Sequence, residues 1–305
     1  MGINTGITIG SLKLKNRVMT ASGTFGYGLR FNGKMDISKI GALVTKGLSV
    51  EPSEGNPMPR ICETTAGMLN SIGLQNIGLK KFEKDMIPKL KETGATVIVN
   101  FYGNSESGYV EAARMLDRME GVHALEMNVS CPNVEKGGIQ FGTDPDVLEK
   151  LTASVRKVTT LPLIVKLSPN VTDIRPFAKG VENAGADAIS AINTLLGMAI
   201  DIKNRKPKLA RIKGGLSGPA IKPVALRIVY ECAQTVKIPI IGIGGITTVE
   251  DVVEFLIAGA SAVQIGTFNF VEPAASERIA GELESYCVEN SIDDIGELVG
   301  SLKTD

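Results

Sequence analysis

Eight short runs of apolar, mostly β-branched residues recur along the chain, and stretches with helical periodicity separate them. Near-continuous runs of Val, Ile and Leu are typical of strands that are buried on both faces of a parallel sheet. The intervening stretches, such as 76–92, 144–158 and 248–260, are amphipathic and begin near Asn, Asp, Ser or Thr, as helices commonly do. The predicted strands are residues 18–22, 42–49, 95–101, 124–130, 161–168, 186–193, 238–245 and 262–268.

This alternation predicts an α/β fold, namely a (β/α)8 TIM barrel in which each strand is linked to a helix. The rival is a Rossmann sheet, but no G-x-G-x-x-G fingerprint follows the first strand. A minimal barrel needs about 250 residues, and the chain has 305, which are predicted to form a single domain, 1–305. The surplus is predicted to form an N-terminal β-hairpin at 3–16, closing the bottom of the barrel, and long insertions at 50–75 and 194–218, after strands two and six. Insertions of that length usually act as lids or binding loops.

The charge balance and the few reactive side chains exclude several classes of protein. Lys and Arg number 33 against 33 Asp and Glu, so the chain lacks the basic surplus of a nucleic-acid binder. No apolar run approaches the roughly 20 residues of a membrane span, and no signal peptide is apparent, so a cytoplasmic protein is expected. One histidine and four scattered cysteines exclude zinc and iron–sulfur sites, and no metal site is predicted. Redox chemistry in this chain would need an organic cofactor.

Polar side chains and glycines end the predicted strands at matching positions. In a barrel of this kind the active site is built at the carboxyl ends of the strands. The residues at these ends are Ser22, Lys46, Gly47, Asn100, Asn128, Lys166, Asn193, Thr194, Gly244, Gly245, Gly266 and Thr267. His123, by contrast, precedes its strand and is predicted to be a structural residue at the opposite end of the barrel.

Lys46 and Lys166 interrupt otherwise apolar strands, and a buried ammonium group costs several kcal/mol unless it is paired. A carboxylate partner is one interpretation, but the strand ends contain no acid, and Glu126 lies two residues before Asn128. A bound anion is therefore favoured as the partner. Four amides, Asn70, Asn100, Asn128 and Asn193, offer paired donors and acceptors that suit a planar heterocycle with imide edges.

Glycines after the last two strands and one cysteine complete the predicted site. Gly244–Gly245 and Gly266–Thr267 stand where barrels commonly bind phosphate, since glycine lets backbone N–H groups approach its oxygens. Cys131 lies in a polar loop after the fourth strand, where a thiol with an ordinary pKa near 8.5 can act as a base. Cys62, Cys232 and Cys287 are predicted to be small buried residues.

Nine segments, in this order, resemble the catalytic subunits of class 1B dihydroorotate dehydrogenases. They are ASGTFGYG (21–28), TKGLS (45–49), NSIGLQN (70–76), NVSCPNV (128–134), VKLSPNV (165–171), AINTLLGMAID (191–201), GGLSGPAIKP (214–223), GIGGI (242–246) and QIGTFNF (264–270). The segments run through most of the chain. Class 1B is suggested by CPNVEKGGIQFGTDP (131–145) and by the TLLGMAID segment.

The resemblance implies an FMN enzyme of pyrimidine (UMP) biosynthesis that oxidises dihydroorotate to orotate. Cys131 would be the general base, flavin N5 would accept the hydride, and Lys166 would stabilise the charge of reduced FMN. The implied FMN residues are Ser22, Lys46, Gly47, Asn100, Asn128, Lys166, Ile192, Gly218, Gly244, Gly245, Gly266 and Thr267. The implied substrate residues are Lys46, Asn70, Ser71, Ile72, Gly73, Leu74, Asn128, Asn193 and Thr194.

The resemblance also implies an electron-transfer partner. A second subunit carrying FAD and a [2Fe–2S] cluster would pass electrons to NAD⁺, in a heterotetramer built on a homodimer of this chain. The alternatives are a class 1A homodimer that uses fumarate, a phosphate-binding barrel aldolase or isomerase in which Lys166 forms a Schiff base, and a non-catalytic flavin-binding scaffold.

Overall fold

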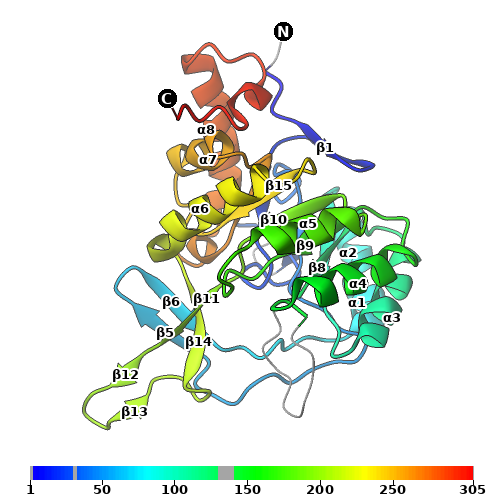
Figure 1. Ribbon diagram of the computed structural model, residues 1–305, viewed down its shortest axis with the longest axis vertical. Coiled ribbons are helices and arrows are strands. Elements are labelled where there is room, and N and C mark those ends of the chain that lie inside the picture. The colour runs from blue at the N-terminus through cyan, green and yellow to red at the C-terminus, as the bar shows by residue number, and fades with distance from the viewer. Residues whose placement is uncertain (1–2, 30–32, 130–140, 305) are drawn as a thin grey trace.

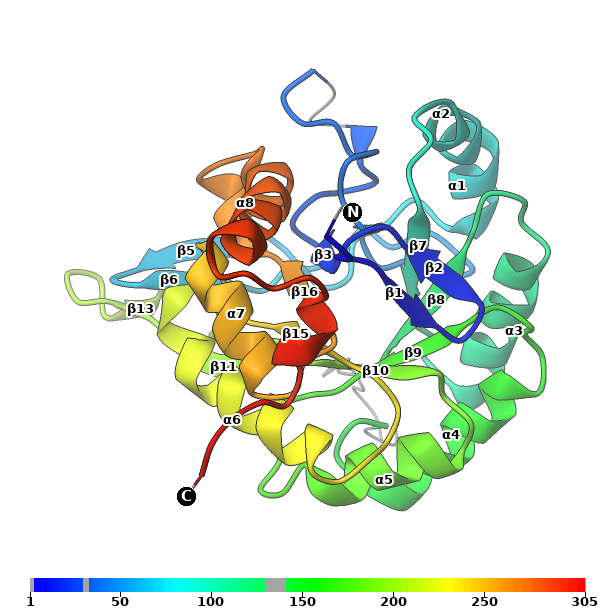
Figure 2. The same ribbon diagram turned by 90° about the horizontal axis from the view of Figure 1, so that it is seen from above.

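The computed structural model describes residues 3–29, 33–129 and 141–304. Eight parallel strands form the central sheet, and each lies beside its neighbours in chain order (Figure 2). The strands are β3 (Val18–Thr20), β4 (Leu43–Val44), β7 (Val97–Phe101), β8 (Ala124–Asn128), β9 (Leu163–Lys166), β10 (Ala188–Ala191), β15 (Ile240–Ile243) and β16 (Ala262–Ile265). A bridge between Met19 and Ala42 joins the first strand to the second. The predicted barrel and all eight predicted strands are confirmed.

Helices pack around the outside of this sheet (Figure 2). They are α1 (Leu79–Asp85), α2 (Ile87–Glu92), α3 (Glu106–Asp117), α4 (Pro145–Arg156), α5 (Arg175–Asn183), α6 (Lys222–Ala233), α7 (Val249–Ile257) and α8 (Ala275–Glu289), with short 3-10 helices η2 (Pro219–Ile221), η3 (Thr267–Phe270) and η4 (Ile295–Leu298). Asp144 caps α4, and Thr248 forms a capping box with Asp251 at the start of α7. No helix within the described ranges is long and apolar enough to cross a membrane.

Two helix predictions need correction. The helix expected over 76–92 divides at Met86 into α1 and α2, because Pro88 has no N–H and its ring clashes with the carbonyl four residues earlier. In the described part of the segment from β3 to β4, residues 21–29 and 33–42, no α-helix is present. The glycine-rich sequence ASGTFGYG at 21–28 explains this, since glycine has low helix propensity.

The predicted N-terminal hairpin closes the bottom of the barrel. β1 (Ile7–Ile9) and β2 (Leu12–Leu14) pair antiparallel. Their apolar side chains join the innermost residues of the barrel strands in one buried cluster that excludes water from this end. His123 lies at the same end, where its Nδ1 accepts from the N–H of Val97 at 3.0 Å. Its predicted place at the start of the strand is confirmed.

The two long insertions fold together into a second sheet. β5 (Ile61–Thr64) and β6 (Gly67–Asn70) come from the first insertion, and β11 (Leu195–Met198) and β14 (Lys213–Ser217) from the second. They form an antiparallel sheet in the order β11-β14-β6-β5, with the hairpin β12 (Ile200–Asp201) and β13 (Lys206–Pro207) beyond it (Figure 1). Figure 1 shows this sheet extending away from the helices that surround the barrel. The sequence predicts the positions of both insertions correctly, but as loops and not as strands.

Candidate active site

Alternate residues of β8 bring two polar side chains into the barrel. Residues two apart in a strand share a face, so Glu126 and Asn128 lie on the same side as Ala124, which belongs to the apolar cluster at the bottom. Strand pairing places Asn100 of β7 beside Glu126 and Lys166 of β9 beside Asn128. A polar layer therefore lies above the apolar bottom of the barrel.

Glu126 is fully buried and connects opposite sides of this layer. Its carboxylate accepts from Asn100 Nδ2 at 2.7 Å and from Gln264 Nε2 at 2.6 Å. Lys166 Nζ lies 3.5 Å from the same carboxylate. Gln264 is on β16, on the far side of the barrel from β8. The predicted anion partner is therefore wrong for Lys166, because the Glu126 carboxylate of the neighbouring strand β8 pairs with it inside the barrel.

Lys166 also connects this layer to the first strand. Its Nζ lies 3.4 Å from Ser22 Oγ, just after β3. On the far side of Asn100, Gly47 stands so close that a Cβ there would lie 2.9 Å from Asn100 Oδ1. Ser22, Lys166 and Asn100, predicted to share one site, are thus connected through the Glu126 carboxylate, and Gly47 lies against Asn100.

Lys46 is half-buried, and within the described part of the chain it makes no ion pair. Burial lowers the pKa of its ammonium group, and the positive charge of Arg60 lowers the pKa further. Both effects disfavour the charged form, and a bound anion would offset them. The predicted anion at Lys46 stays a prediction.

The amides after β8 and β10 form a second part of the site. Asn193 Nδ2 donates to Asn128 Oδ1 at 3.2 Å, and Asn193 Oδ1 accepts from the N–H of Thr194 at 2.8 Å. Thr194 lies against Gly215, where a Cβ would be 2.0 Å from its Oγ1. Gly215 is paired with Asn70, and its carbonyl accepts from Asn70 Nδ2 at 3.2 Å. The insertion sheet thus carries Asn70 to the same edge as Asn193.

The loop that follows Asn70 is held on two sides. Asn56 donates to the carbonyl of Ser71 through Nδ2 at 3.1 Å and to that of Ile72 through its N–H at 3.0 Å. A Cβ on Gly73 would lie 2.5 Å from the nitrogen of Asn56. The loop therefore packs tightly against Asn56, earlier in the same insertion, and only a residue without a side chain fits at position 73.

Leu74 ends this loop in an unusual backbone conformation. Its φ of 56° lies in the left-handed region, which non-glycine residues seldom adopt. Its carbonyl accepts from Asn76 Nδ2 at 3.0 Å and from the hydroxyl of Tyr102 at 3.1 Å. Asn76 and Tyr102 were not among the predicted site residues. Both hold the loop through the Leu74 carbonyl. Asn76 is part of the segment NSIGLQN, but nothing in the sequence indicates this contact, and Tyr102 lies outside the quoted segments.

The residues after the last two strands both lie against the segment of Ser217 and Gly218. A Cβ on Gly245 would be 3.1 Å from the carbonyl oxygen of Gly218, and one on Gly266 would be 3.4 Å from Ala21. Thr267 Oγ1 donates to Ser217 Oγ at 2.8 Å. Gly244 and Gly245 have φ of 139° and 74° and leave the backbone open to close approach. Ile192 is buried at the end of β10.

The amino-acid sequence has close relatives among known proteins. A sequence model described as "Dihydroorotate dehydrogenase" matches residues 6–287. The chain is 56% identical to a protein of Geotalea daltonii and to one of Geobacter metallireducens, each over 97% of both chains. It is 55% identical to one of Geotalea uraniireducens over 98% of both. All three are named "Dihydroorotate dehydrogenase B (NAD(+)), catalytic subunit". The chain belongs to the dihydroorotate dehydrogenase family.

In this dihydroorotate dehydrogenase family member the predicted base, Cys131, lies outside the described residues. The other three cysteines are free thiols. Burial raises the pKa of the Cys232 thiol to about 12, and burial raises that of Cys287 as well, so neither is suited to act as a base. Cys62 lies half-buried on β5. Its predicted burial is wrong, because β5 is the edge strand of the insertion sheet.

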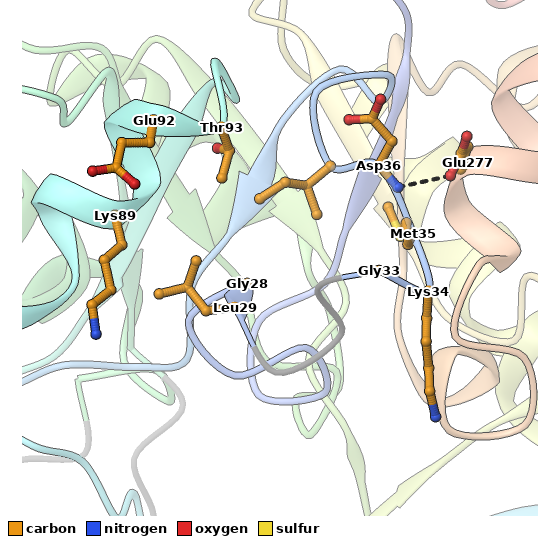
Figure 3. Close-up of a pocket in the computed structure, with 11 residues that line it drawn as sticks. Gly28, Leu29, Gly33, Lys34, Met35, Asp36, Lys89, Glu92, Thr93 and Glu277 are labelled. Atoms are coloured by element: carbon orange, nitrogen blue, oxygen red, sulfur yellow. Dashed lines mark hydrogen bonds between the residues drawn. The ribbon is translucent and has the colours of Figure 1, made fainter.

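A pocket of about 930 Å³ lies away from this rim, on the outside of the dihydroorotate dehydrogenase barrel. Figure 3 shows it between the end of α2, with Lys89, Glu92 and Thr93, and the loop at 33–36, where the N–H of Asp36 donates to Glu277 of α8 at 2.8 Å. Of the described residues that line it, none belongs to the predicted site. Both basic and acidic side chains line it.

Proposed function

We propose that this chain is the FMN-binding catalytic subunit of a class 1B dihydroorotate dehydrogenase, which oxidises dihydroorotate to orotate in pyrimidine (UMP) biosynthesis. The observation that carries the proposal is the identity of 55–56% to catalytic subunits of that name over 97–98% of the chain. The polar layer at the carboxyl ends of the strands supports it, because it presents cations, amides and glycine turns at one rim, as binding of a phosphorylated, imide-bearing cofactor requires.

The residues present fit FMN. Asn100 Oδ1 is buried and has no hydrogen-bond partner among the described residues, so an acceptor is available for a ring N–H. Ser22, Lys46, Gly47, Asn100, Asn128, Lys166 and Ile192 would line the ring, and Gly218, Gly244, Gly245, Gly266 and Thr267 would lie around it or bind the phosphate. FMN, when bound, supplies the acceptor for the hydride that leaves C6 of the substrate. The Lys166 ammonium would stabilise negative charge on the ring.

Dihydroorotate would bind through its carboxylate and its imide. The Lys46 ammonium binds the carboxylate and regains the stabilisation that burial and Arg60 remove from it. Asn70, Asn128, Asn193 and Thr194 offer the amide and hydroxyl groups that hydrogen-bond to the ring. The loop of Ser71, Ile72, Gly73 and Leu74 lies against one side of these amides and positions the reacting carbons.

Cys131 would remove the C5 proton of dihydroorotate as a thiolate. The proton moves from C5 to Sγ, and the electron pair of the broken C–H bond becomes part of the new C5–C6 double bond as the hydride leaves C6. This role comes from the resemblance of the segment NVSCPNV to the family. The substrate would lie between the thiolate and the cofactor, so that proton and hydride leave from opposite faces.

The electrons would leave through a partner. The relatives are named catalytic subunits, which supports a second subunit. We propose that this subunit carries FAD and a [2Fe–2S] cluster, accepts electrons from FMN and reduces NAD⁺, and that a homodimer of this chain is the centre of a heterotetramer in the cytoplasm.

An absorption spectrum of the purified chain tests the proposal. We expect a yellow protein with one FMN per chain that dihydroorotate bleaches in the absence of oxygen. A colourless protein that borohydride inactivates in the presence of substrate would instead indicate a Schiff base on Lys166. Turnover of the isolated chain with fumarate would replace the class 1B assignment with class 1A.

A further inference from the structure

Glu126 has no role in the chemistry proposed above, yet it is the acid at the centre of the polar layer. Its side chain is fully buried. It accepts hydrogen bonds from Asn100 at 2.7 Å and Gln264 at 2.6 Å, and Lys166 lies 3.5 Å away. Three donor groups therefore surround the Glu126 carboxylate, and its hydrogen-bonding capacity is used, as is typical of a specific buried polar network.

The chemistry of a carboxylate determines how its amide neighbours are oriented. A carboxylate can only accept, so an amide beside it must present its NH₂ group. Asn100 therefore points Nδ2 at Glu126 and turns Oδ1 away, and Gln264 does the same with Nε2 and Oε1. Both oxygens, Asn100 Oδ1 and Gln264 Oε1, are buried and lack a hydrogen-bond partner within the described ranges. Glu126 thus converts two ambivalent amides into acceptors.

Of these two oxygens, Asn100 Oδ1 lies beside Gly47, a predicted FMN residue. A Cβ at Gly47 would lie 2.9 Å from it, so glycine at this position keeps a side chain off the oxygen. Leaving a buried acceptor unpaired costs free energy, which a ligand N–H would recover. The oxidised isoalloxazine ring carries a single N–H, at N3 of its imide.

We infer that Glu126 is a positioning residue, which fixes the Asn100 amide so that Oδ1 accepts the N3–H of FMN. The inference rests on the proposed FMN site. The Glu126 carboxylate acts through Asn100 and does not touch the cofactor. If Glu126 becomes an amide, the Asn100 side chain can turn over, because Gln can donate as well as accept, and Asn100 then presents an NH₂ group to a donor.

The test is ¹⁵N NMR of the protein reconstituted with ¹⁵N-labelled FMN, together with the FMN dissociation constant of the apoprotein. In the wild type we expect an N3 resonance shifted downfield from free FMN, with an N3–H proton protected from solvent exchange. In Glu126→Gln we expect the N3 shift to move toward that of free FMN and the dissociation constant to rise about ten- to hundredfold.

Lys166 variants separate the amide effect from the loss of the ion pair. Removing one partner of a buried pair strands the other, whereas replacing both by neutral groups is tolerated. In the Lys166→Met background, which removes the predicted FMN contact of Lys166 from both proteins alike, adding Glu126→Gln is expected to move the N3 resonance further toward that of free FMN and to weaken FMN binding at least about tenfold relative to Lys166→Met alone. The double variant also serves if Glu126→Gln alone fails to fold.

Two outcomes would overturn the inference: a wild-type N3–H that exchanges as fast as in free FMN, or an N3 resonance that Glu126→Gln leaves unchanged both in the wild type and in the Lys166→Met background. A wild-type protein that binds no FMN would refute the proposed cofactor instead, so the two failures are distinguishable.

Discussion

Tyr102→Phe tests how the loop from Asn70 to Leu74 is held. The Tyr102 hydroxyl donates to the Leu74 carbonyl at 3.1 Å and accepts from Asn76 Nδ2 at 2.9 Å and from Ser49 Oγ at 3.0 Å. Leu74 has a φ of 56°, a conformation that costs a non-glycine residue about 1–2 kcal/mol. The hydrogen bonds to its carbonyl offset that cost, so the loop should be sensitive to losing one of them.

The size of the effect follows from the geometry. The Leu74 carbonyl keeps its hydrogen bond from Asn76 and loses one neutral hydrogen bond, worth about 0.5–1.5 kcal/mol. Asn76 and Ser49 also lose the Tyr102 oxygen as an acceptor, but each keeps another one. If the substrate-binding conformation of the loop is destabilised by that amount, KM for dihydroorotate rises about two- to twelvefold. The FMN content and kcat should change by less than about twofold, because the described contacts of the Tyr102 hydroxyl are with loop residues and not with predicted FMN residues.

Steady-state kinetics with dihydroorotate, alongside the absorption ratio of FMN to protein, measures both quantities. Tyr286→Phe, on α8, is the matched control and should leave KM at the wild-type value. A fall in kcat with unchanged KM in Tyr102→Phe would refute the reasoning, since it would place the effect in the chemical step and not in the substrate loop.

Three further predictions concern the base, a lysine and a helix cap. Cys131→Ala should keep its yellow FMN but lose most turnover, measured with dihydroorotate; near wild-type turnover would remove the base assignment. Because burial and Arg60 lower the pKa of Lys46, its ammonium group loses its proton at a pH below the ordinary pKa of 10.5. KM for dihydroorotate should therefore begin to rise at an alkaline pH below 10.5. A KM that does not change over this range would contradict carboxylate binding by Lys46. Burial acts to raise the pKa of Asp251, but hydrogen bonds from Lys222, Thr247 and Thr248 outweigh it and leave the pKa below its ordinary value of 3.8. The wild type should therefore be more stable than Asp251→Asn by its full margin above about pH 4, and the margin should shrink as the pH falls through the lowered pKa. Chemical denaturation at several pH values measures this margin, and a margin that grows on acidification would contradict the assignment.

Local sequence patterns were sufficient to predict the barrel strands and the polar residues at their carboxyl ends. A strand buried on both faces needs an almost uninterrupted apolar run, and the polar residue that ends such a run faces the site because parallel strands end at one edge. For that reason the amino-acid sequence is enough to assign Asn128, Lys166 and Gly244 to one rim. The N-caps at Asp144 and Thr248 are equally local, since a cap bonds to residues two or three positions away.

Long-range pairings lie beyond the reach of such patterns. Strand β6 pairs with β14, more than a hundred residues later, so the insertions read as two loops although they form one sheet. Glu126 stands inside its strand and not at the end, so the pattern of strand ends does not select it. Its alternation with Asn128 is visible in the sequence, but its contact with Gln264, 138 residues away, is not.

The amino-acid sequence alone therefore determined the barrel, the order of its strands and the kind of side chain at each strand end, because burial and periodicity act over a few neighbouring residues. The tertiary structure decided that Lys166 is paired with Glu126, that Tyr102 supports Leu74 and that the insertions share a sheet. These contacts join residues that are far apart in the chain, and only the tertiary fold brings such residues within hydrogen-bonding distance.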